Sequence, residues 1–182
     1  MPIIRPAMTY ADLAHMPDDG KRYELLEGVL TVSPSPNRKH QWVVWNLVIF
    51  FTQVKAARYG EAYVAPFDVI LGTHNVVQPD VLFIRTDRLS IVTEDNVQGA
   101  PDLVVEVLSP ATRDRDLTAK AHLYAQFGIT EYWIVDPDAE TLAVYQLTDT
   151  GYAGGDPLTG SATWTSPLFS TVPVSVAKLF HP

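Results

Sequence analysis

The chain has 182 residues, of which 47% are hydrophobic and 19% are charged, so it can bury a substantial core and is not a disordered chain. It contains no cysteine, which excludes a disulfide framework and a thiolate metal site. The net charge of −8 argues against a large sequence-independent nucleic-acid surface, although carboxylates gathered to bind a divalent metal also make a site acidic.

Hydrophobic periodicity, capping residues and turn residues divide the chain into alternating helices and strands. The predicted elements are, in chain order, a helix over 9–15, a hairpin over 23–32, a long helix over 38–59, strands over 61–71, 81–84 and 103–108, a helix over 114–127, and strands over 131–135 and 141–147. We therefore predict an α/β (α+β) fold with a mixed β-sheet flanked by helices and an N-terminal β-hairpin. A single domain spans 1–182, with its core over about 8–150 and a β-rich C-terminal extension over 151–182.

No export signal or membrane segment is visible in the sequence. Met1–Tyr10 lacks a basic start followed by an apolar run. The most apolar stretch, Trp42–Phe51, is too short to span a bilayer. We therefore expect a cytoplasmic protein without a membrane partner.

The middle of the long predicted helix is apolar on nearly every side, so more than one of its faces should be buried. Either the domain wraps around this helix or a second subunit covers part of it. Trp42, Trp45, Phe50 and Phe51 lie close together in the helix, and large apolar patches usually mark interfaces. We therefore expect a homodimer.

Two acids occur in or beside apolar strands. Glu106 interrupts Leu103–Leu108, and an ionised carboxylate in a buried strand is costly unless it is paired or bound to a metal. It is either part of a structural salt bridge or a functional acid, and the rarity of a lone acid in a central strand favours function. Asp80 follows Pro79 at the start of another strand, a position where turn acids are also common. Together the two acids indicate a site for Mg²⁺ or Mn²⁺.

Lys120 lies near the middle of the apolar arc of the predicted helix, which also carries Leu117 and Leu123. Lysine is almost never fully buried without a partner. Its stem can snorkel to the surface, or it can pair with Asp116 one turn earlier. The alternative is that its ammonium points over the sheet towards Glu106.

The remaining candidates give weaker signals. Glu24 lies in the predicted hairpin, where exposed glutamates are ordinary, and His40 near the start of the long helix is weaker still. Arg113 and Arg115, at the start of the predicted helix over 114–127, either contact phosphates or are solvated.

Several blocks of the sequence resemble one known family. They are Pro79-Asp80-Val81, the stretch 101–110 around Glu106, then Lys120, Tyr124 and Gly128, the stretch 131–137, the hairpin residues 23–28, and Ser33-Pro34. This pattern is similar to the Uma-two family of restriction-endonuclease-like bacterial proteins over about residues 8–150. The resemblance implies the PD-(D/E)XK nuclease fold and metal-dependent hydrolysis of phosphodiester bonds, with DNA as the expected nucleic acid.

The sequence departs from the usual pattern of that superfamily at two positions. The lysine expected two residues after the glutamate is replaced by Leu108, and the resemblance implies that Lys120 supplies it instead. The acid that is common in the family just after the hairpin turn is replaced by Val29, which leaves Glu24 or Glu27 as the hairpin acid.

The resulting hypothesis is an endonuclease in which Asp80 and Glu106, with Glu24 as a further candidate, hold one or two Mg²⁺ or Mn²⁺ ions and Lys120 orients the attacking water. The rival hypothesis is a catalytically silent, dimeric interaction module on the same scaffold. The pI near 4.9 and the absence of a basic groove favour the rival, whereas the presence of all three central residues favours the enzyme.

Overall fold

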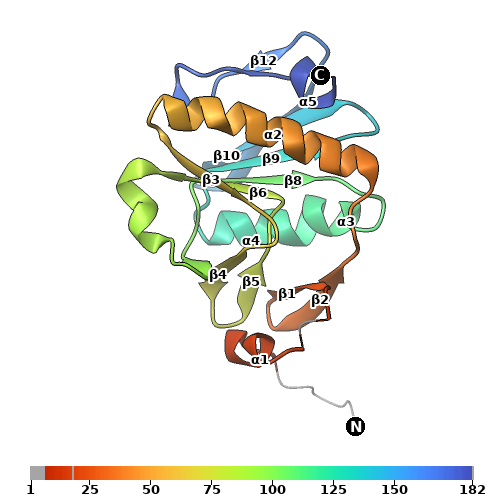
Figure 1. The fold of residues 1–182 in the computed structure, drawn as a ribbon, viewed down its shortest axis with the longest axis vertical. Helices are drawn as coiled ribbons and strands as arrows, with labels where there is room; N and C mark the ends of the chain where they lie inside the picture. Colours follow the sequence, from red (N-terminus) through yellow and green to blue (C-terminus); the bar gives the residue numbers. More distant parts are fainter. Residues whose placement is uncertain (1–6, 18, 182) are drawn as a thin grey trace.

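A computed structural model describes residues 7–17 and 19–181; residues 1–6, 18 and 182, which include much of Met1–Tyr10, lie outside the described part. A central sheet lies between a long helix, α2, on one face and the helical segment α3–α4 on the other (Figure 1). A second sheet and the short helix α1 lie at the end of the molecule opposite α5 (Figure 1). The predicted fold class, a mixed sheet core flanked by helices, is confirmed.

The central sheet has six strands in the order β11-β10-β9-β8-β6-β3. All neighbours are antiparallel except β8 and β9, which are parallel and therefore need the helical crossover that joins them. Its strands are β3 (Gly60–Val64), β6 (Val81–Arg85), β8 (Leu103–Val107), β9 (Glu131–Asp136), β10 (Thr141–Thr148) and β11 (Gly151–Thr159).

Helix α2 (Arg38–Ala56) begins at Asn37, whose side chain accepts a hydrogen bond from the backbone N–H of His40 at 3.0 Å. Its inner face buries residues such as Leu47 and Phe50 against the aromatic side chains of the central sheet. Its outer face does not become buried, because Trp42, Trp45 and Ile49 are 44%, 61% and 49% exposed. The homodimer that we expect to cover this face stays a prediction. In the described residues no helix is long and apolar enough to cross a membrane.

The crossover from β8 to β9 contains an irregular helix. The single predicted helix over 114–127 is α3 (Arg113–Arg115), a π-helical turn (Asp116–Lys120) and α4 (Ala121–Gln126). The π turn widens the helix and rotates the residues around it, which explains why the prediction for Leu117 was wrong: its side chain is 38% exposed, whereas Asp116 is buried. Lys120, predicted on the buried side, is 2% exposed.

The second sheet has the order β2-β1-β5-β4-β7 and contains the predicted hairpin, which turns through Glu27 and Gly28 at positive φ. The predicted strand 61–71 is in fact two strands in different sheets, β3 and β4, separated by a segment that contains Pro66, which cannot donate to a ladder. The elements of this part are α1 (Tyr10–Ala14), β1 (Arg22–Leu26), β2 (Val29–Ser33), β4 (Asp68–Gly72), β5 (Asn75–Val77) and β7 (Asn96–Gln98).

The C-terminal segment, predicted as an extension, is built into the core. Strand β11 extends the central sheet, and Phe169, Val174 and Leu179 are buried in the apolar cluster beneath α2. The segment also contributes β12 (Thr163–Trp164), β13 (Val174–Ser175) and α5 (Ala177–Phe180).

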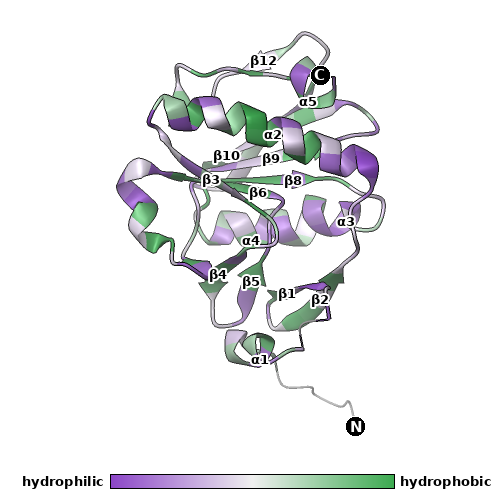
Figure 2. Ribbon diagram, viewed as in Figure 1, coloured by the Kyte–Doolittle hydropathy of each residue, from purple (hydrophilic) through white to green (hydrophobic). Residues whose placement is uncertain are grey.

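The central strand β8 is where burial and polarity conflict. Its ribbon is hydrophobic along most of its length, while α2 alternates between hydrophobic and hydrophilic turns (Figure 2). Leu103, Val105 and Val107 belong to the cluster beneath α2, and Val104 belongs to the cluster on the α4 side. Glu106 points to the α4 side together with Val104, as strand alternation predicts.

Candidate functional site

Most of the candidate residues line one cavity of about 270 Å³ beside the carboxyl end of β8. Asp80, Glu106, Lys120, Arg115 and His40 all lie on its wall. These residues come from β8, from the segment preceding β6, from the crossover helix and from α2, so the fold gathers them from distant parts of the sequence.

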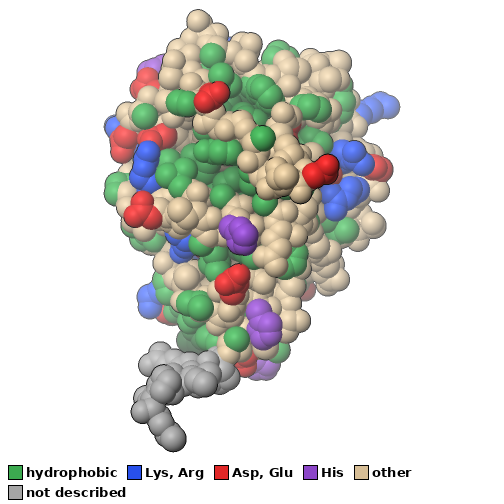
Figure 3. Space-filling model, turned by 180° about the vertical axis from the view of Figure 1, so that it is seen from behind, with side chains coloured by type: hydrophobic (Ala, Val, Ile, Leu, Met, Phe, Trp, Pro, Cys, Tyr) green, Lys and Arg blue, Asp and Glu red, His purple; other side chains and the backbone are tan. Residues whose placement is uncertain are grey.

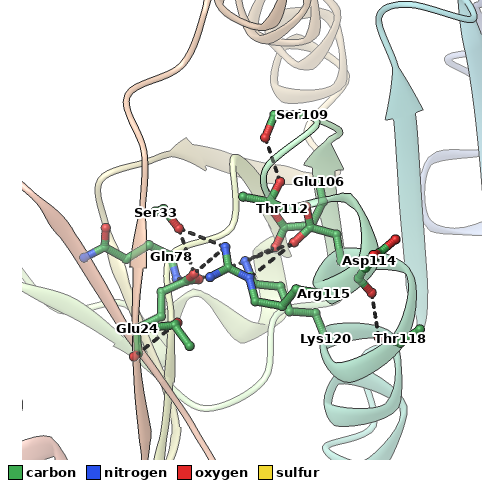
Figure 4. Close-up of polar contacts among 12 residues, drawn as sticks. Glu24, Ser33, Gln78, Glu106, Ser109, Thr112, Asp114, Arg115, Thr118 and Lys120 are labelled. Carbon is green, nitrogen blue, oxygen red and sulfur yellow. Dashed lines mark hydrogen bonds and ion pairs between the residues drawn. The ribbon is translucent and has the colours of Figure 1, made fainter.

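Lys120 lies at the centre of the cluster (Figure 4). Its Nζ atom is 2.9 Å from Oε1 of Glu106 and 2.9 Å from Oε1 of Glu24, and it is 3.8 Å from Oδ1 of Asp116. Burial alone lowers the pKa of a lysine, but the surrounding carboxylates outweigh it and raise the pKa of Lys120. Because only 3% of its side chain is exposed, snorkelling is excluded. The pairing with Asp116 exists, but it is the longest of the three contacts.

Glu106 accepts hydrogen bonds at Oε1 from Lys120 Nζ at 2.9 Å and from the Tyr124 hydroxyl at 2.6 Å. Burial raises the pKa of Glu106 to about 8 despite the attraction of Lys120, and the charges of Asp116, Asp80 and Glu24 act in the same direction as burial. In the metal-free protein Glu106 therefore holds its proton more tightly than an exposed glutamate does.

Asp80 is held in place by three groups. Its Oδ2 atom accepts from His40 Nε2 at 3.0 Å and from the backbone N–H of Val107 at 2.9 Å, and its Oδ1 lies 3.4 Å from a guanidinium nitrogen of Arg22. Burial acts to raise the pKa of Asp80, but the hydrogen bond and charge of His40 and the N–H of Val107 keep that pKa below its usual value. The contact with Val107 ties Asp80 to the residue that follows Glu106.

Glu24, not Glu27, is the hairpin acid that belongs to the site. It is 1% exposed and accepts hydrogen bonds from Ser33 Oγ at 3.2 Å and from the N–H of Gln78 at 2.9 Å. Burial opposes its ionisation, but Lys120 and the Gln78 N–H outweigh burial and lower the pKa of Glu24. Glu27 is exposed at the turn.

The two arginine candidates have different surroundings. Arg115 lies 3.4 Å from Oε2 of Glu24 and donates to Ser33 Oγ at 2.9 Å, so it forms part of the site (Figure 4). Arg113 pairs with Asp136 at 2.6 Å, is half exposed, and does not line the cavity.

Sequence reasoning missed three residues of the site: Arg22, Tyr124 as a hydrogen-bond donor, and Asp116 as a buried acid. Strand alternation places Arg22 on the same face as Glu24, and helical spacing places Tyr124 one turn after Lys120, so both signals were present. The burial of Asp116 depends on the π turn, whose carbonyl at Asp116 accepts from the Tyr132 hydroxyl at 2.8 Å. No local pattern predicts that turn.

Comparison with known proteins decides the family. Residues 10–177 match the sequence model of Uma2, described as "Putative restriction endonuclease". The chain belongs to the Uma2 family. Among solved structures, it is similar to one described as a "putative nuclease belonging to DUF820" from Anabaena variabilis, with a TM-score of 0.79, 22% identity, and coverage of 95% of this chain and 97% of that chain. That likeness shows the fold, and no curated protein matched.

The site of this Uma2 protein contains the type of ligand atom that a divalent metal prefers. Asp80, Glu106 and Glu24 supply hard carboxylate oxygens, and Oδ1 of Asp116 is buried without a hydrogen-bond partner. Within the described ranges, no three acidic or histidine side chains are grouped closely enough to hold an ion as they stand, because Lys120 lies between the carboxylates. Mg²⁺, however, is commonly held by one or two carboxylates together with waters and substrate phosphates.

Proposed function

We propose that this Uma2 protein is a metal-dependent endonuclease that hydrolyses phosphodiester bonds in DNA. The observation that carries the proposal is the buried Lys120, which lies 2.9 Å from both Glu24 and Glu106 on the wall of a cavity that also contains Asp80. Family membership supports the same reaction class, since the family model carries the description "Putative restriction endonuclease".

The proposed metal ligands are Asp80 and Glu106, with Glu24 as a further carboxylate nearby. A bound Mg²⁺ or Mn²⁺ would supply Lewis-acid polarisation of the scissile phosphate and a lower pKa for the attacking water. His40 and the Val107 N–H fix the orientation of the Asp80 carboxylate, which is the role that outer-shell partners usually have.

Lys120 is the proposed group that stabilises developing charge. Its raised pKa keeps it protonated at neutral pH, so it acts as a hydrogen-bond donor to a phosphate oxygen or to the attacking water and not as a base. Glu24 and Glu106 hold the ammonium in position, and burial strengthens its interaction with a charge in the cavity. Arg22, at the edge of the cavity, is the proposed first contact for an incoming phosphate.

The test is cleavage of duplex DNA, single-stranded DNA and RNA by the wild-type protein with Mg²⁺, with Mn²⁺ and with a chelator. We expect metal-dependent cleavage of DNA that Asp80→Asn reduces by about two to four powers of ten, the range for loss of one catalytic group. Cleavage that persists in the chelator, or a wild-type rate in Asp80→Asn, would contradict the proposal.

The second candidate is the catalytically silent interaction module. The observation that favours it is the exposed apolar face of α2, which carries Trp42, Trp45 and Ile49. On the face opposite that of Figure 1, the lysine and arginine side chains of the described residues lie mainly at the margins and form no broad basic patch on that face (Figure 3). If the folded wild-type protein, with its Lys120 cluster intact, cleaves no nucleic acid with any metal tested, the result would favour the module.

A further inference from the structure

A second hollow of about 440 Å³ opens beside the candidate active site and has no role in the proposed chemistry. Its walls are largely apolar and come from the outer face of α2 and from the end of β3, with Trp45, Val44, Val48 and Val64 as the main side chains. Trp45 and Val64 are 61% and 41% exposed. The fold therefore leaves a large indole uncovered at this place.

This hollow adjoins the active-site cavity, and the two share four wall residues. Arg22, Pro36, His40 and Asp80 line both. A chain that crosses from one to the other passes the guanidinium of Arg22 and the carboxylate of Asp80. The apolar hollow is therefore an immediate neighbour of the proposed scissile phosphate.

Two polar groups at this junction can take further partners. His40, at 6% exposure, has an Nδ1 atom that is buried without a hydrogen-bond partner, so its hydrogen-bonding capacity is unused in this structure. Arg22 contacts Asp80 only at 3.4 Å, and 23% of its side chain is exposed. An occupant with an anionic part at Arg22 and a flat apolar part at Trp45 matches this arrangement.

A nucleotide has these two parts. The net charge of −8 limits the affinity for nucleic acid that the protein gains by neutralising phosphates. Stacking of a base on an aromatic side chain adds affinity that does not depend on the net charge. We propose that the hollow binds the base of a nucleotide next to the scissile phosphate, stacked on Trp45, while Arg22 contacts its phosphate. This inference rests on the proposed function, and it names the substrate class.

The substrate class follows from the geometry of base stacking. A base in a duplex stacks on its neighbours, and unstacking it costs a few kcal/mol. A site that stacks a base on Trp45 therefore favours single-stranded DNA, or a duplex with an unpaired stretch, over intact duplex.

The test is the binding of a fluorescent single-stranded DNA oligonucleotide with Ca²⁺, followed by anisotropy, for the wild type and for Trp45→Ala, Trp45→Phe and Trp42→Ala. Trp42 is a matched control, because it lies on the same helix, is 44% exposed and does not line the hollow. We expect Trp45→Ala to weaken binding by about 5- to 100-fold, as loss of one stacked base does, and Trp45→Phe to retain most of the affinity. Trp42→Ala should bind as the wild type does.

Wild-type affinity in Trp45→Ala would overturn the inference, and so would equal binding of intact duplex and single strand. If Trp45→Ala changes the protein from dimer to monomer in light scattering while DNA binding per chain is unchanged, the face is a subunit interface instead.

Hydrolysis of the small diester bis(p-nitrophenyl) phosphate separates this inference from the proposed function. Activity on that diester together with Trp45-independent DNA binding refutes the base site alone, whereas Trp45-dependent DNA binding without any hydrolysis supports the base site and refutes the nuclease.

Discussion

The ammonium of Lys120 lies 2.9 Å from the carboxylate of Glu24, so the crossover helix is tied to the N-terminal hairpin by a buried ion pair. The pair spans the second sheet and the helical layer of the central sheet, and it lies beside the carboxylate of Glu106. One interaction therefore positions the proposed catalytic lysine and joins two parts of the fold.

Replacing Lys120 with methionine should affect stability and activity separately. The change leaves buried carboxylates without their cation, so we expect the free energy of unfolding to fall by about 3–5 kcal/mol in metal-free buffer. At temperatures where the variant is still folded, its rate of DNA hydrolysis should be lower than that of the wild type by about two to four powers of ten. Urea denaturation and cleavage rates check the two effects, with Lys39→Met as the control because Lys39 pairs with an exposed aspartate. A folded Lys120→Met protein with wild-type rates would refute the role of this lysine.

Glu24→Gln should weaken the link between hairpin and helix. Because the pKa of Glu24 is lowered in the folded protein, its charge contributes stability above the ordinary value of 4.5 that is lost as the pH falls. We expect the variant to be less stable than the wild type at neutral pH, with a difference that shrinks in acid. Glu27→Gln, at the exposed turn of the same hairpin, is the matched control. If Glu24→Gln and Glu27→Gln lose the same stability, the ion pair of Glu24 with Lys120 does not stabilise the fold.

The stability of the metal-free protein should depend on pH through Glu106. Its pKa is about 8 in the folded protein and 4.5 ordinarily, so the folded state binds this proton more tightly. Its contribution is fully present below 4.5 and is lost as the pH rises through about 8. Relative to Glu106→Gln, the wild type should become steadily less stable over this range, and added Mn²⁺ should restore stability at the upper end. Urea midpoints measured across the range check this, with the exposed Glu94→Gln as control; parallel curves for the wild type and Glu106→Gln would count against it.

His40 is proposed to position Asp80 and not to act on substrate. We expect His40→Ala to weaken Mn²⁺ binding by about 10- to 100-fold, the usual effect of losing an outer-shell partner. His40→Gln should recover part of the affinity, since its amide can donate to Asp80. Calorimetric titration with Mn²⁺ provides the measurement. If both variants bind Mn²⁺ as tightly as the wild type, His40 does not orient a metal ligand.

The site residues that could be predicted from the sequence are charged residues within otherwise apolar strands or helix faces. Glu106 in an apolar strand and Lys120 in an apolar helix arc can be recognised within a few residues of sequence, and the structure places them 2.9 Å apart. Their role in catalysis stays a prediction, as does the metal. The hairpin and the alternation of helices and strands were predictable for the same reason, because their signals are local.

The rest depends on contacts that no local pattern contains. Glu24 is buried only because the hairpin packs against the crossover helix, and hairpin glutamates are ordinarily exposed. Leu117 is exposed, contrary to its predicted place on the buried side of the helix, because a π turn changes the helical periodicity at this point. The segment 61–71 forms β3 and β4, which belong to different sheets. This division depends on which distant strands each part pairs with, and the local sequence does not contain that information.

The most direct test of the central claim is the rate of DNA cleavage by Glu106→Gln beside that of the wild type, with Mg²⁺ or Mn²⁺. Glutamine has nearly the shape of the protonated glutamate, so it can preserve the contacts with Lys120 and Tyr124 while removing the charge. We predict that the wild type cleaves DNA in a metal-dependent manner and that the variant, folded and equally soluble, is slower by at least about 100-fold. Equal rates in the two proteins, or no metal-dependent cleavage by the wild type, would contradict the assignment of this cluster as a nuclease site.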